Sequence, residues 1–242
     1  MTQQPKVALV TGGNKGIGLE ICRQLGRLEC TVLLGSRDLA RGEEAAQQLR
    51  AENLEVHAVP VDATKPATFA KLRDRIASDH GRLDILINNA GIGLDWEYTA
   101  DNMPVQMLRE TFEVNFFGVV ELTQVLLPLI LKSPAGRIVN QSSMLGALAI
   151  HADPGSKLEN IKPLAYNSSK AALNAFTIHL AAALKDTPVK VNSAHPGSVL
   201  TDLNPEGSLT VEEGARTAVE LATLPADGPT RGFFYMGKPV PW

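Results

Sequence analysis

The chain has 242 residues, of which 44% are hydrophobic, 20% are charged and 5% are aromatic. This composition supplies a sizeable apolar core and excludes a disordered or low-complexity chain. With 23 basic and 26 acidic residues the formal net charge is -3, so no basic excess indicates a nucleic acid or an anionic membrane as partner. The length is typical of one α/β domain, and we expect a single domain over residues 1–242 that binds a small molecule.

Short β-branched runs alternate with longer amphipathic segments along the chain, which is typical of a parallel sheet between helices. Strands are expected at 7–11, 31–35, 56–61, 85–88, 137–141, 189–194 and 233–236. Helices are expected at 17–28, 39–52, 68–80, 105–131, 165–185 and 211–224. No repeat or linker divides the chain. We predict an α/β fold, a single doubly wound Rossmann-type domain with a seven-stranded parallel sheet and helices on both faces.

The amino-terminal residues carry no secretory signal, and no apolar run approaches the ~18 residues of a membrane span. We therefore expect a cytoplasmic protein that does not associate with a membrane. Cys22 and Cys30 have no metal-ligand spacing and are expected to be reduced thiols. The histidines show no ligand spacing either, so we predict no metal.

The first predicted strand runs directly into a glycine-rich turn that a helix follows at once, Thr11-Gly12-Gly13-Asn14-Lys15-Gly16-Ile17-Gly18. Glycines in this setting let the backbone approach a pyrophosphate, and the helix amino terminus offers free N–H groups to the anion. The spacing is G-x-x-x-G-x-G and differs from the generic G-x-G-x-x-G. Taken alone, the turn is either a phosphate site or a structural turn.

The second predicted strand ends in Gly35-Ser36-Arg37-Asp38. Enzymes that select NAD place an acid here for the ribose 2′-OH, whereas enzymes that select NADP use a nearby arginine. Ser36 stands where the acid would be, Arg37 can clamp a 2′-phosphate, and Lys15 can add a second positive charge. Asp38 competes with this interpretation but fits better as the N-cap of the next helix. We expect NADPH in preference to NADH.

Tyr166 and Lys170 lie four residues apart at the start of a predicted helix, so their side chains share one face. An adjacent ammonium favours phenolate and moves the pKa of a tyrosine toward the working range of an acid–base catalyst. Such a pair also arises by chance on amphipathic helices. Three other strand ends carry polar or glycine-rich sequences, Asn88-Asn89-Ala90-Gly91, Asn140-Gln141-Ser142-Ser143 and His195-Pro196-Gly197-Ser198-Val199-Leu200-Thr201-Asp202. All belong to the edge of the sheet where doubly wound folds bind ligands.

Together these motifs resemble those of the short-chain dehydrogenase/reductase superfamily, of the compact type with Thr-Gly-x-x-x-Gly-x-Gly and Tyr-x-x-x-Lys, over essentially the whole chain. The chain is most similar to the carbonyl reductase branch, through the glycine turn, Ser36-Arg37-Asp38, Asn115-Phe116-Phe117-Gly118 and residues 239–242. The resemblance implies NADPH-dependent reduction of a ketone, aldehyde or quinone to an alcohol by hydride transfer.

The resemblance also implies a catalytic tetrad. Tyr166 would be the general acid that protonates the carbonyl oxygen, and Ser143 would hydrogen-bond that oxygen. Lys170 would lower the pKa of Tyr166 and hold the nicotinamide ribose, while Asn115 would hold a water that links the lysine to a proton relay. Ser143 is chosen over Ser142 because the catalytic serine of the family is the later of the two.

Cofactor contacts follow from the same resemblance. The glycine turn would bind through Gly12, Asn14, Lys15, Gly16, Ile17 and Gly18, and the 2′-phosphate through Ser36 and Arg37. Asp62, with Ala63 beside it, would bind the adenine amino group. Asn89, Ala90 and Gly91 would pack against the adenosine ribose, and Pro196, Gly197, Val199 and Thr201 would hold the carboxamide and pyrophosphate.

The stretch between Ser143 and Tyr166 is longer than in minimal family members and shorter than the insertion of animal carbonyl reductases. Minimal members associate through the helices that flank this stretch, whereas a long insertion leaves a monomer. An intermediate length is compatible with both, and we favour a homodimer. Segment 147–163 is expected to be irregular and to border the ligand crevice. The substrate is expected to be determined by loops 92–102, 144–163 and 203–210, and the sequence does not identify it.

Two other functions use the same fold. A dinucleotide-binding sensor without turnover usually lacks the tyrosine or the lysine, and both are present here. An enoyl reductase, which acts on a C=C bond, places the two residues further apart. His195 fits a packed histidine better than a relay member, whereas Trp96 and Tyr98 either line an apolar pocket or are incidental.

Overall fold

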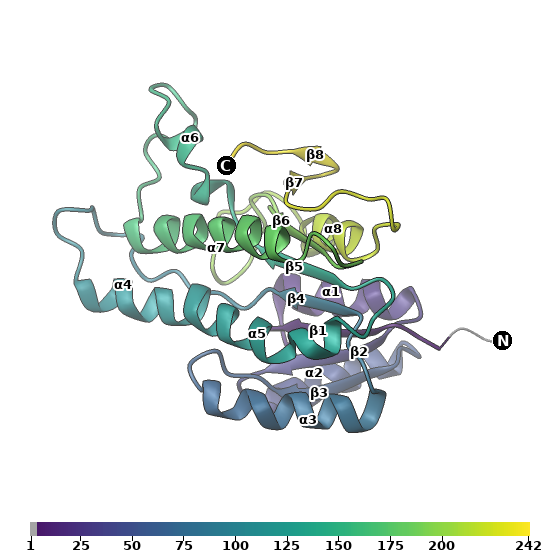
Figure 1. Cartoon of the computed structure of the whole chain (residues 1–242). Coiled ribbons are helices and arrows are strands. Elements are labelled where there is room, and N and C mark those ends of the chain that lie inside the picture. The colour runs from purple at the N-terminus through teal and green to yellow at the C-terminus, as the bar shows by residue number, and fades with distance from the viewer. Residues whose placement is uncertain (1–3) are drawn as a thin grey trace.

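One sheet forms the centre of the computed structural model, which describes residues 4–242. Its strand order is β3-β2-β1-β4-β5-β6-β7-β8, with helices on both faces (Figure 1). The strands are β1 (Val7–Thr11), β2 (Thr31–Ser36), β3 (Val56–Pro60), β4 (Ile85–Asn88), β5 (Arg137–Gln141), β6 (Lys190–Ala194), β7 (Phe233–Tyr235) and β8 (Lys238–Pro239). The order reverses between β1 and β4, which is where doubly wound sheets open a ligand crevice.

The prediction of a doubly wound parallel sheet is confirmed for β1 to β7, and an eighth strand was missed. β8 pairs antiparallel with β7 through Tyr235 and Lys238. The two residues between them, Met236 and Gly237, have φ values of 48° and 73°, as a tight hairpin requires. A two-residue strand carries no readable hydrophobic alternation, so the sequence pattern could not reveal it.

Eight α-helices connect the strands within the described part of the chain. They are α1 (Gly16–Arg27), α2 (Leu39–Ala51), α3 (Phe69–His80), α4 (Val105–Phe112), α5 (Gly118–Ile130), α6 (Leu148–His151), α7 (Leu164–Ala183) and α8 (Val211–Ala222). The single helix expected over 105–131 is interrupted by a π-helical turn, Glu113–Phe117. The segment expected to be irregular, 147–163, contains one helical turn, α6, and otherwise turns and bends.

Apolar side chains cover both faces of the sheet. In β1, Ala8 and Val10 belong to the core formed with α1, α2 and α8, while Val7 and Leu9 belong to the core formed with α3, α5 and α7. Burying a Leu or Val side chain stabilises the fold by roughly 1.5–3 kcal/mol. Because both faces are covered, the strands read as continuous apolar runs, and the polar side chains gather at the strand ends.

The stretch Val105–Ile130 is long and apolar enough to cross a membrane by length and composition alone. In the structure 44% of its most apolar window is buried within the protein. Leu122, Leu126 and Leu129 of α5 pack in the core beneath the sheet. Core helices commonly have this composition, since a helix that is apolar all round is usually buried.

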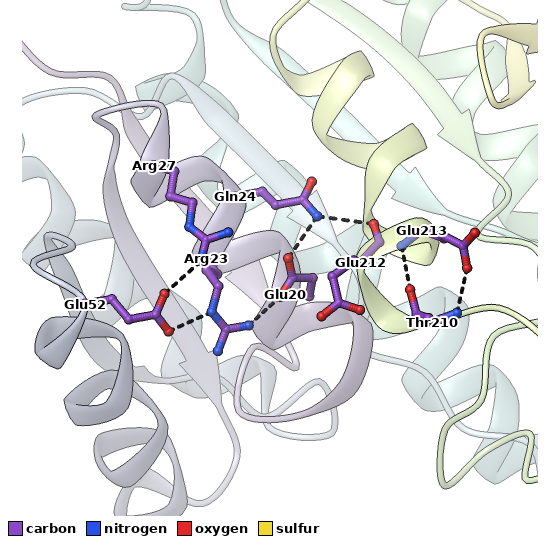
Figure 2. Close-up of polar contacts among 8 residues, drawn as sticks. All are labelled: Glu20, Arg23, Gln24, Arg27, Glu52, Thr210, Glu212 and Glu213. Atoms are coloured by element: carbon purple, nitrogen blue, oxygen red, sulfur yellow. Dashed lines mark hydrogen bonds and ion pairs between the residues drawn. The ribbon is translucent and has the colours of Figure 1, made fainter.

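A polar network joins α1 to its neighbours (Figure 2). Glu20 of α1 is 2% exposed, and its carboxylate accepts hydrogen bonds from Arg23 and, at 2.9 Å, from Gln24. Arg23 also donates to Glu52 at the end of α2, at 2.8 Å. Gln24 donates to the backbone oxygen of Glu212 in α8, at 3.2 Å. The helix that begins at the glycine turn is thereby held against two others.

Candidate active site

The glycine turn between β1 and α1 has the geometry of an anion site. Gly12 and Gly16 have φ values of 64° and 54°, in the region that favours glycine. A Cβ at Gly18 would lie 2.2 Å from the backbone oxygen of Gly12, so only glycine fits there. The first turn of α1 has neither a capping side chain nor an acidic residue, which leaves its N–H groups for a ligand. This donor set fits the pyrophosphate of a dinucleotide.

The end of β2 combines a small buried residue with an exposed arginine. Ser36 is buried, and its Oγ donates to the backbone oxygen of Asp38 at 2.7 Å. The carboxylate of Asp38 accepts the N–H groups of Ala40 and Arg41, at 3.0 and 3.2 Å. The prediction that Asp38 caps α2 is therefore confirmed. Arg37 is exposed and has no ion-pair partner among residues 4–242.

The loop after β6 folds over the glycine turn. A Cβ at Gly16 would lie 3.7 Å from Cγ2 of Thr201. Lys15 Nζ lies 2.6 Å from Asp202 Oδ2, in an exposed ion pair. Lys15, expected to add a positive charge near a 2′-phosphate, forms this ion pair because the loop after β6 returns to the turn, and its role toward a phosphate stays a prediction. Gly197, with φ of 87°, starts the loop, and a Cβ there would lie 2.4 Å from Leu209.

Asp62 follows β3 in a setting that keeps its carboxylate charged. Oδ1 accepts from the backbone N–H and the hydroxyl of Thr64, at 3.0 and 2.7 Å, and Oδ2 lies 3.2 Å from Lys65 Nζ. Partial burial opposes the charge, but these contacts outweigh it and lower the pKa of Asp62. Ala63 lies directly against α5, because a Cβ at Gly118 would approach its backbone oxygen to 2.3 Å.

The four residues of the predicted tetrad converge on one buried place. Ser143 follows β5, Asn115 lies in the π-helical turn, and Tyr166 and Lys170 lie on α7. All four are buried, with exposed fractions between 1% and 8%. A Cβ at Gly91 would lie 3.4 Å from both Asn115 Oδ1 and Lys170 Nζ. The ends of β4 and β5, the π-helical turn and α7 thus meet at these side chains.

Asn115 braces the loop after β4 against α7. Its Oδ1 accepts from Ile92 N at 2.9 Å, and its Nδ2 donates to Ile92 O at 2.8 Å and to Ser169 Oγ at 3.0 Å. π-helical turns occur frequently at functional sites, where the extra residue redirects a side chain. In this structure the amide of Asn115 is bound by protein groups on both of its polar atoms.

Burial governs the acid–base properties of the site. It raises the pKa of Tyr166 to about 12, although hydrogen bonding with Ser143 acts in the opposite direction. Burial also lowers the pKa of Lys170 to about 8. Desolvation is thus the main influence on the Tyr166 pKa in this structure, and the expected lowering by Lys170 stays a prediction. The phenol is protonated at neutral pH and can act as a proton donor.

His195 packs behind the serine. Its Nδ1 accepts from Met144 N at 3.3 Å, and its ring centre lies 5.0 Å from that of Tyr235. Burial lowers the pKa of His195 to about 4, so the ring is neutral at physiological pH. Ser143 Oγ accepts from Leu145 N at 3.2 Å. The histidine thus supports the backbone beside Ser143 through the N–H of Met144.

The remaining predicted cofactor residues lie along the same carboxyl edge of the sheet. Asn14 and Ile17 belong to the glycine turn and the first turn of α1, Ala90 follows β4, and Pro196 and Val199 follow β6. No group of three or more His, Cys, Asp or Glu side chains within residues 4–242 is arranged to hold a metal ion. Cys22 and Cys30 are free and buried.

Sequence reasoning missed three residues of this region. The Thr11 hydroxyl accepts the N–H groups of Asn89 and Ala90, each at 3.0 Å, and so joins β1 to the loop after β4. Gln141 is buried, and neither polar atom of its side chain has a hydrogen-bond partner within the described residues. A buried amide of this kind fits a site that receives a polar ligand. Asp95 is fully buried next to α7. Thr11 and Gln141 are the last residues of β1 and β5, so their place at a strand end was the available signal, whereas Asp95 lies in the loop after β4 and carried none.

A doubly wound sheet, a turn that fits a pyrophosphate and a buried Tyr–Lys pair beside it define the class of dinucleotide-dependent oxidoreductases. The model of the family described as short chain dehydrogenase matches residues 6–211. The chain therefore belongs to the short-chain dehydrogenase/reductase family, and the expected resemblance is confirmed.

Relatives and solved structures match nearly the whole chain. Short-chain dehydrogenase/reductase 1 of Saponaria officinalis is 38% identical, with 98% of this chain and 96% of the relative covered. Carbonyl reductase [NADPH] 1 of Macaca fascicularis is 37% identical, with 97% of each chain covered. The structure of an NADPH-bound carbonyl reductase from chicken fatty liver superimposes with a TM-score of 0.86 at 27% identity, covering 98% of this chain and 94% of that one.

Proposed function

We propose that the protein reduces a carbonyl group of a small molecule to an alcohol with NADPH, with Tyr166 as the general acid. The observation that carries this proposal is the buried Tyr166 phenol, protonated at neutral pH and one helical turn from the buried ammonium of Lys170. A reductase needs a proton donor at the carbonyl oxygen and a positive charge to receive the resulting anion. The family and the carbonyl reductases among its relatives support the same reaction.

The side chains divide the work as follows. The hydroxyls of Tyr166 and Ser143 donate hydrogen bonds to the carbonyl oxygen of the substrate. When bound, the reduced nicotinamide supplies the hydride. As negative charge grows on the oxygen, Tyr166 transfers its proton, and Lys170 stabilises the phenolate that remains. We assign the return of a proton to a water near Lys170 and Asn115.

The cofactor preference rests on the end of β2. A buried serine at position 36 presents no carboxylate to repel a 2′-phosphate, and the exposed guanidinium of Arg37 follows it. Arginine binds phosphate through paired charge-assisted hydrogen bonds. The phosphate-fitting turn at Gly12, Gly16 and Gly18 and the charged acceptor at Asp62 supply the other ends of a dinucleotide site. The NADPH carried by the similar carbonyl reductase structure supports this assignment.

A candidate place for the apolar part of a substrate is an open hollow of about 350 Å³ whose wall includes Met144, the residue that follows Ser143 in the chain, although neither Ser143 nor Tyr166 lines it. Tyr235 and the carboxyl-terminal residues Met236, Lys238, Pro239, Val240 and Pro241 form the rest of its wall. Apolar walls of this kind bind the apolar part of a ligand while a few polar groups orient it. We therefore propose ketones, aldehydes or quinones with an apolar body.

A carbonyl panel followed by the loss of NADPH absorbance tests the proposal. The wild-type protein should turn over at least one class of the panel, and Tyr166→Phe should lower kcat by about 10³-fold, within the range known for general-acid catalysis. NADPH binding by Tyr166→Phe, measured by fluorescence titration, should remain within a few-fold of the wild type. Thr187→Val removes a hydroxyl that donates to the backbone oxygen of Leu184 at 2.7 Å before β6, at the opposite edge of the sheet, and serves as the control, with native kcat.

Tyr166→Phe turnover at the native rate would overturn the assignment of the acid. NADPH binding without turnover of any carbonyl would favour the dinucleotide sensor, and reduction of an enoyl substrate alone would favour C=C chemistry.

We also propose a cytoplasmic homodimer. Val105 and Phe117 of the α4–α5 stretch are apolar side chains that are 60% and 48% exposed, and a contact between two copies would cover such side chains. Sedimentation of the purified protein distinguishes the dimer from a monomer.

A further inference from the structure

A buried carboxylate from another part of the chain caps the helix that carries the tyrosine. Asp95, in the loop after β4, has no exposed surface. Its Oδ2 accepts from Ala165 N at 2.6 Å and its Oδ1 from Tyr166 N at 3.3 Å. These are the second and third residues of α7, whose N–H groups an N-cap side chain normally satisfies.

The residue at the N-cap position of α7 cannot do this itself. It is Pro163, whose side chain has no hydrogen-bonding atom, and α7 has no acidic residue in its first turn. The N–H groups of Ala165 and Tyr166 are buried and need acceptors. A carboxylate at a helix amino terminus also interacts favourably with the helix dipole. The cap for the catalytic helix therefore comes from a residue 70 positions away.

The loop that carries Asp95 is anchored at two points near the site. The backbone N–H of Ile92 donates to the side-chain oxygen of Asn115 at 2.9 Å, and the backbone oxygen of Ile92 accepts from the side-chain nitrogen of Asn115 at 2.8 Å. Next to Asp95, the ring of Trp96 lies against that of Tyr166, with centres 5.2 Å apart and planes inclined by 40°. Asp95 thus holds the backbone of Tyr166 while its neighbour contacts the ring.

We propose that Asp95 is a positioning residue for the reduction: its carboxylate sets where α7 begins and thereby where the Tyr166 hydroxyl stands relative to Ser143. This inference rests on the proposed function, in which that hydroxyl donates the proton. Asp95 touches the backbone of Tyr166 and does not itself exchange protons with the substrate. A displacement of about 1 Å at a reacting group can cost on the order of 10²-fold in rate.

Two substitutions separate the loss of the negative charge of Asp95 from the loss of both of its acceptor oxygens. Asp95→Ala removes both acceptor oxygens and should lower kcat by about 10²-fold, while the Kd for NADPH changes by less than about threefold. Asp95→Asn keeps one acceptor oxygen and should lower kcat by about 10-fold. Amide hydrogen exchange at Ala165 and Tyr166 should be faster in both variants, and fastest in Asp95→Ala, because the carboxylate shields these two groups.

Asp84 provides a matched control. It precedes β4 as Asp95 follows it, is 3% exposed, and accepts a backbone N–H from Val7 at 2.9 Å. Asp84→Asn should lower thermal stability and leave both kcat and the exchange of Ala165 and Tyr166 unchanged. If Asp95→Ala does not fold, Asp95→Asn provides the decisive comparison.

Three results would overturn the inference: native kcat in both Asp95 variants, a fall in kcat without faster exchange at Ala165 and Tyr166, or an equal fall in kcat in Asp84→Asn. Failure of the proposed function has a different signature, because the wild-type protein would then turn over no carbonyl. Wild-type turnover combined with unaffected Asp95 variants contradicts the inference alone.

Discussion

The ammonium nitrogen of Lys170 lies 5.6 Å from the ring centre of Tyr166, and both side chains are buried. Lys170 Nζ donates to the backbone oxygen of Gln141 at 2.8 Å, which holds it in place. Burial moves the two pKa values apart, the lysine down to about 8 and the tyrosine up to about 12. Over the physiological range the pair is therefore a neutral phenol beside a lysine that begins to lose its charge near neutrality.

This relationship predicts the pH dependence of reduction. The value of kcat/KM should stay level below the Lys170 pKa of about 8 and then fall about tenfold per pH unit, as the free enzyme loses the ammonium. Tyr166 stays protonated throughout, since its pKa is about 12. Lys170→Arg keeps a positive charge at all these pH values and should remove the alkaline limb. An unchanged limb in Lys170→Arg would show that another group titrates.

The end of β2 predicts the cofactor preference. Arg37→Ala should raise the KM for NADPH by roughly 10- to 100-fold, as expected for loss of hydrogen bonds between charged groups, and should leave the KM for NADH unchanged. Ser36→Asp should invert the preference, because a carboxylate repels the 2′-phosphate. The control is Arg41→Ala: Arg41 is also an exposed arginine, paired with Asp38 at 3.6 Å, and its loss should change the KM for NADPH less than the loss of Arg37 does. A higher kcat/KM with NADH in the wild type would refute this assignment and leave the enzyme class intact.

The geometry of the glycine turn predicts that one methyl group added at Gly18 weakens NADPH binding. A Cβ at Gly18 would stand 2.2 Å from the backbone oxygen of Gly12, and backbone cannot yield as a flexible side chain does. Gly18→Ala should therefore displace the turn and weaken NADPH binding by at least about 10²-fold, since the N–H groups would no longer converge on the phosphate. Fluorescence titration measures the Kd, and circular dichroism establishes that the variant is folded. Native affinity in a folded variant would exclude this turn as the phosphate site.

The network on α1 predicts a cost in stability. Arg23→Ala leaves the carboxylate of Glu20, which is 2% exposed, without its cation (Figure 2). The expected loss is about 3 kcal/mol in the free energy of unfolding, because a buried charge without a partner is strongly destabilising. Adding Glu20→Gln should restore most of this loss. Urea unfolding of the two single variants and the double variant gives the coupling, and additive losses would contradict it.

Much of the site could be predicted because its signals are local. The glycine turn after β1, the serine after β5 and the Tyr–Lys pair on α7 each lie within a few residues of a strand end or on one helical face. Parallel strands bring their carboxyl ends to one edge, so local motifs at successive strand ends had to meet. The same local reasoning identified Asp38 as the cap of α2, because an N-cap contacts residues two and three positions ahead.

The cap on α7 shows why local reasoning was insufficient there. Nothing near Pro163 in the sequence supplies an acceptor, and Asp95 reaches Ala165 only because the loop after β4 folds against α7. The pairing of Lys15 with Asp202, 187 positions apart, depends in the same way on the loop after β6.

The sequence alone determined the order of strands and helices, the polar strand ends and the placing of Tyr166 and Lys170 on one helical face. These features follow from the period of apolar residues and from backbone geometry. Only the tertiary structure decided the charge states of that pair, the interruption of the helix at Asn115 and the origin of the cap on α7. Desolvation depends on which distant segments exclude water from a group, and the cap on α7 depends on which loop packs against that helix. Both are determined only when the chain folds.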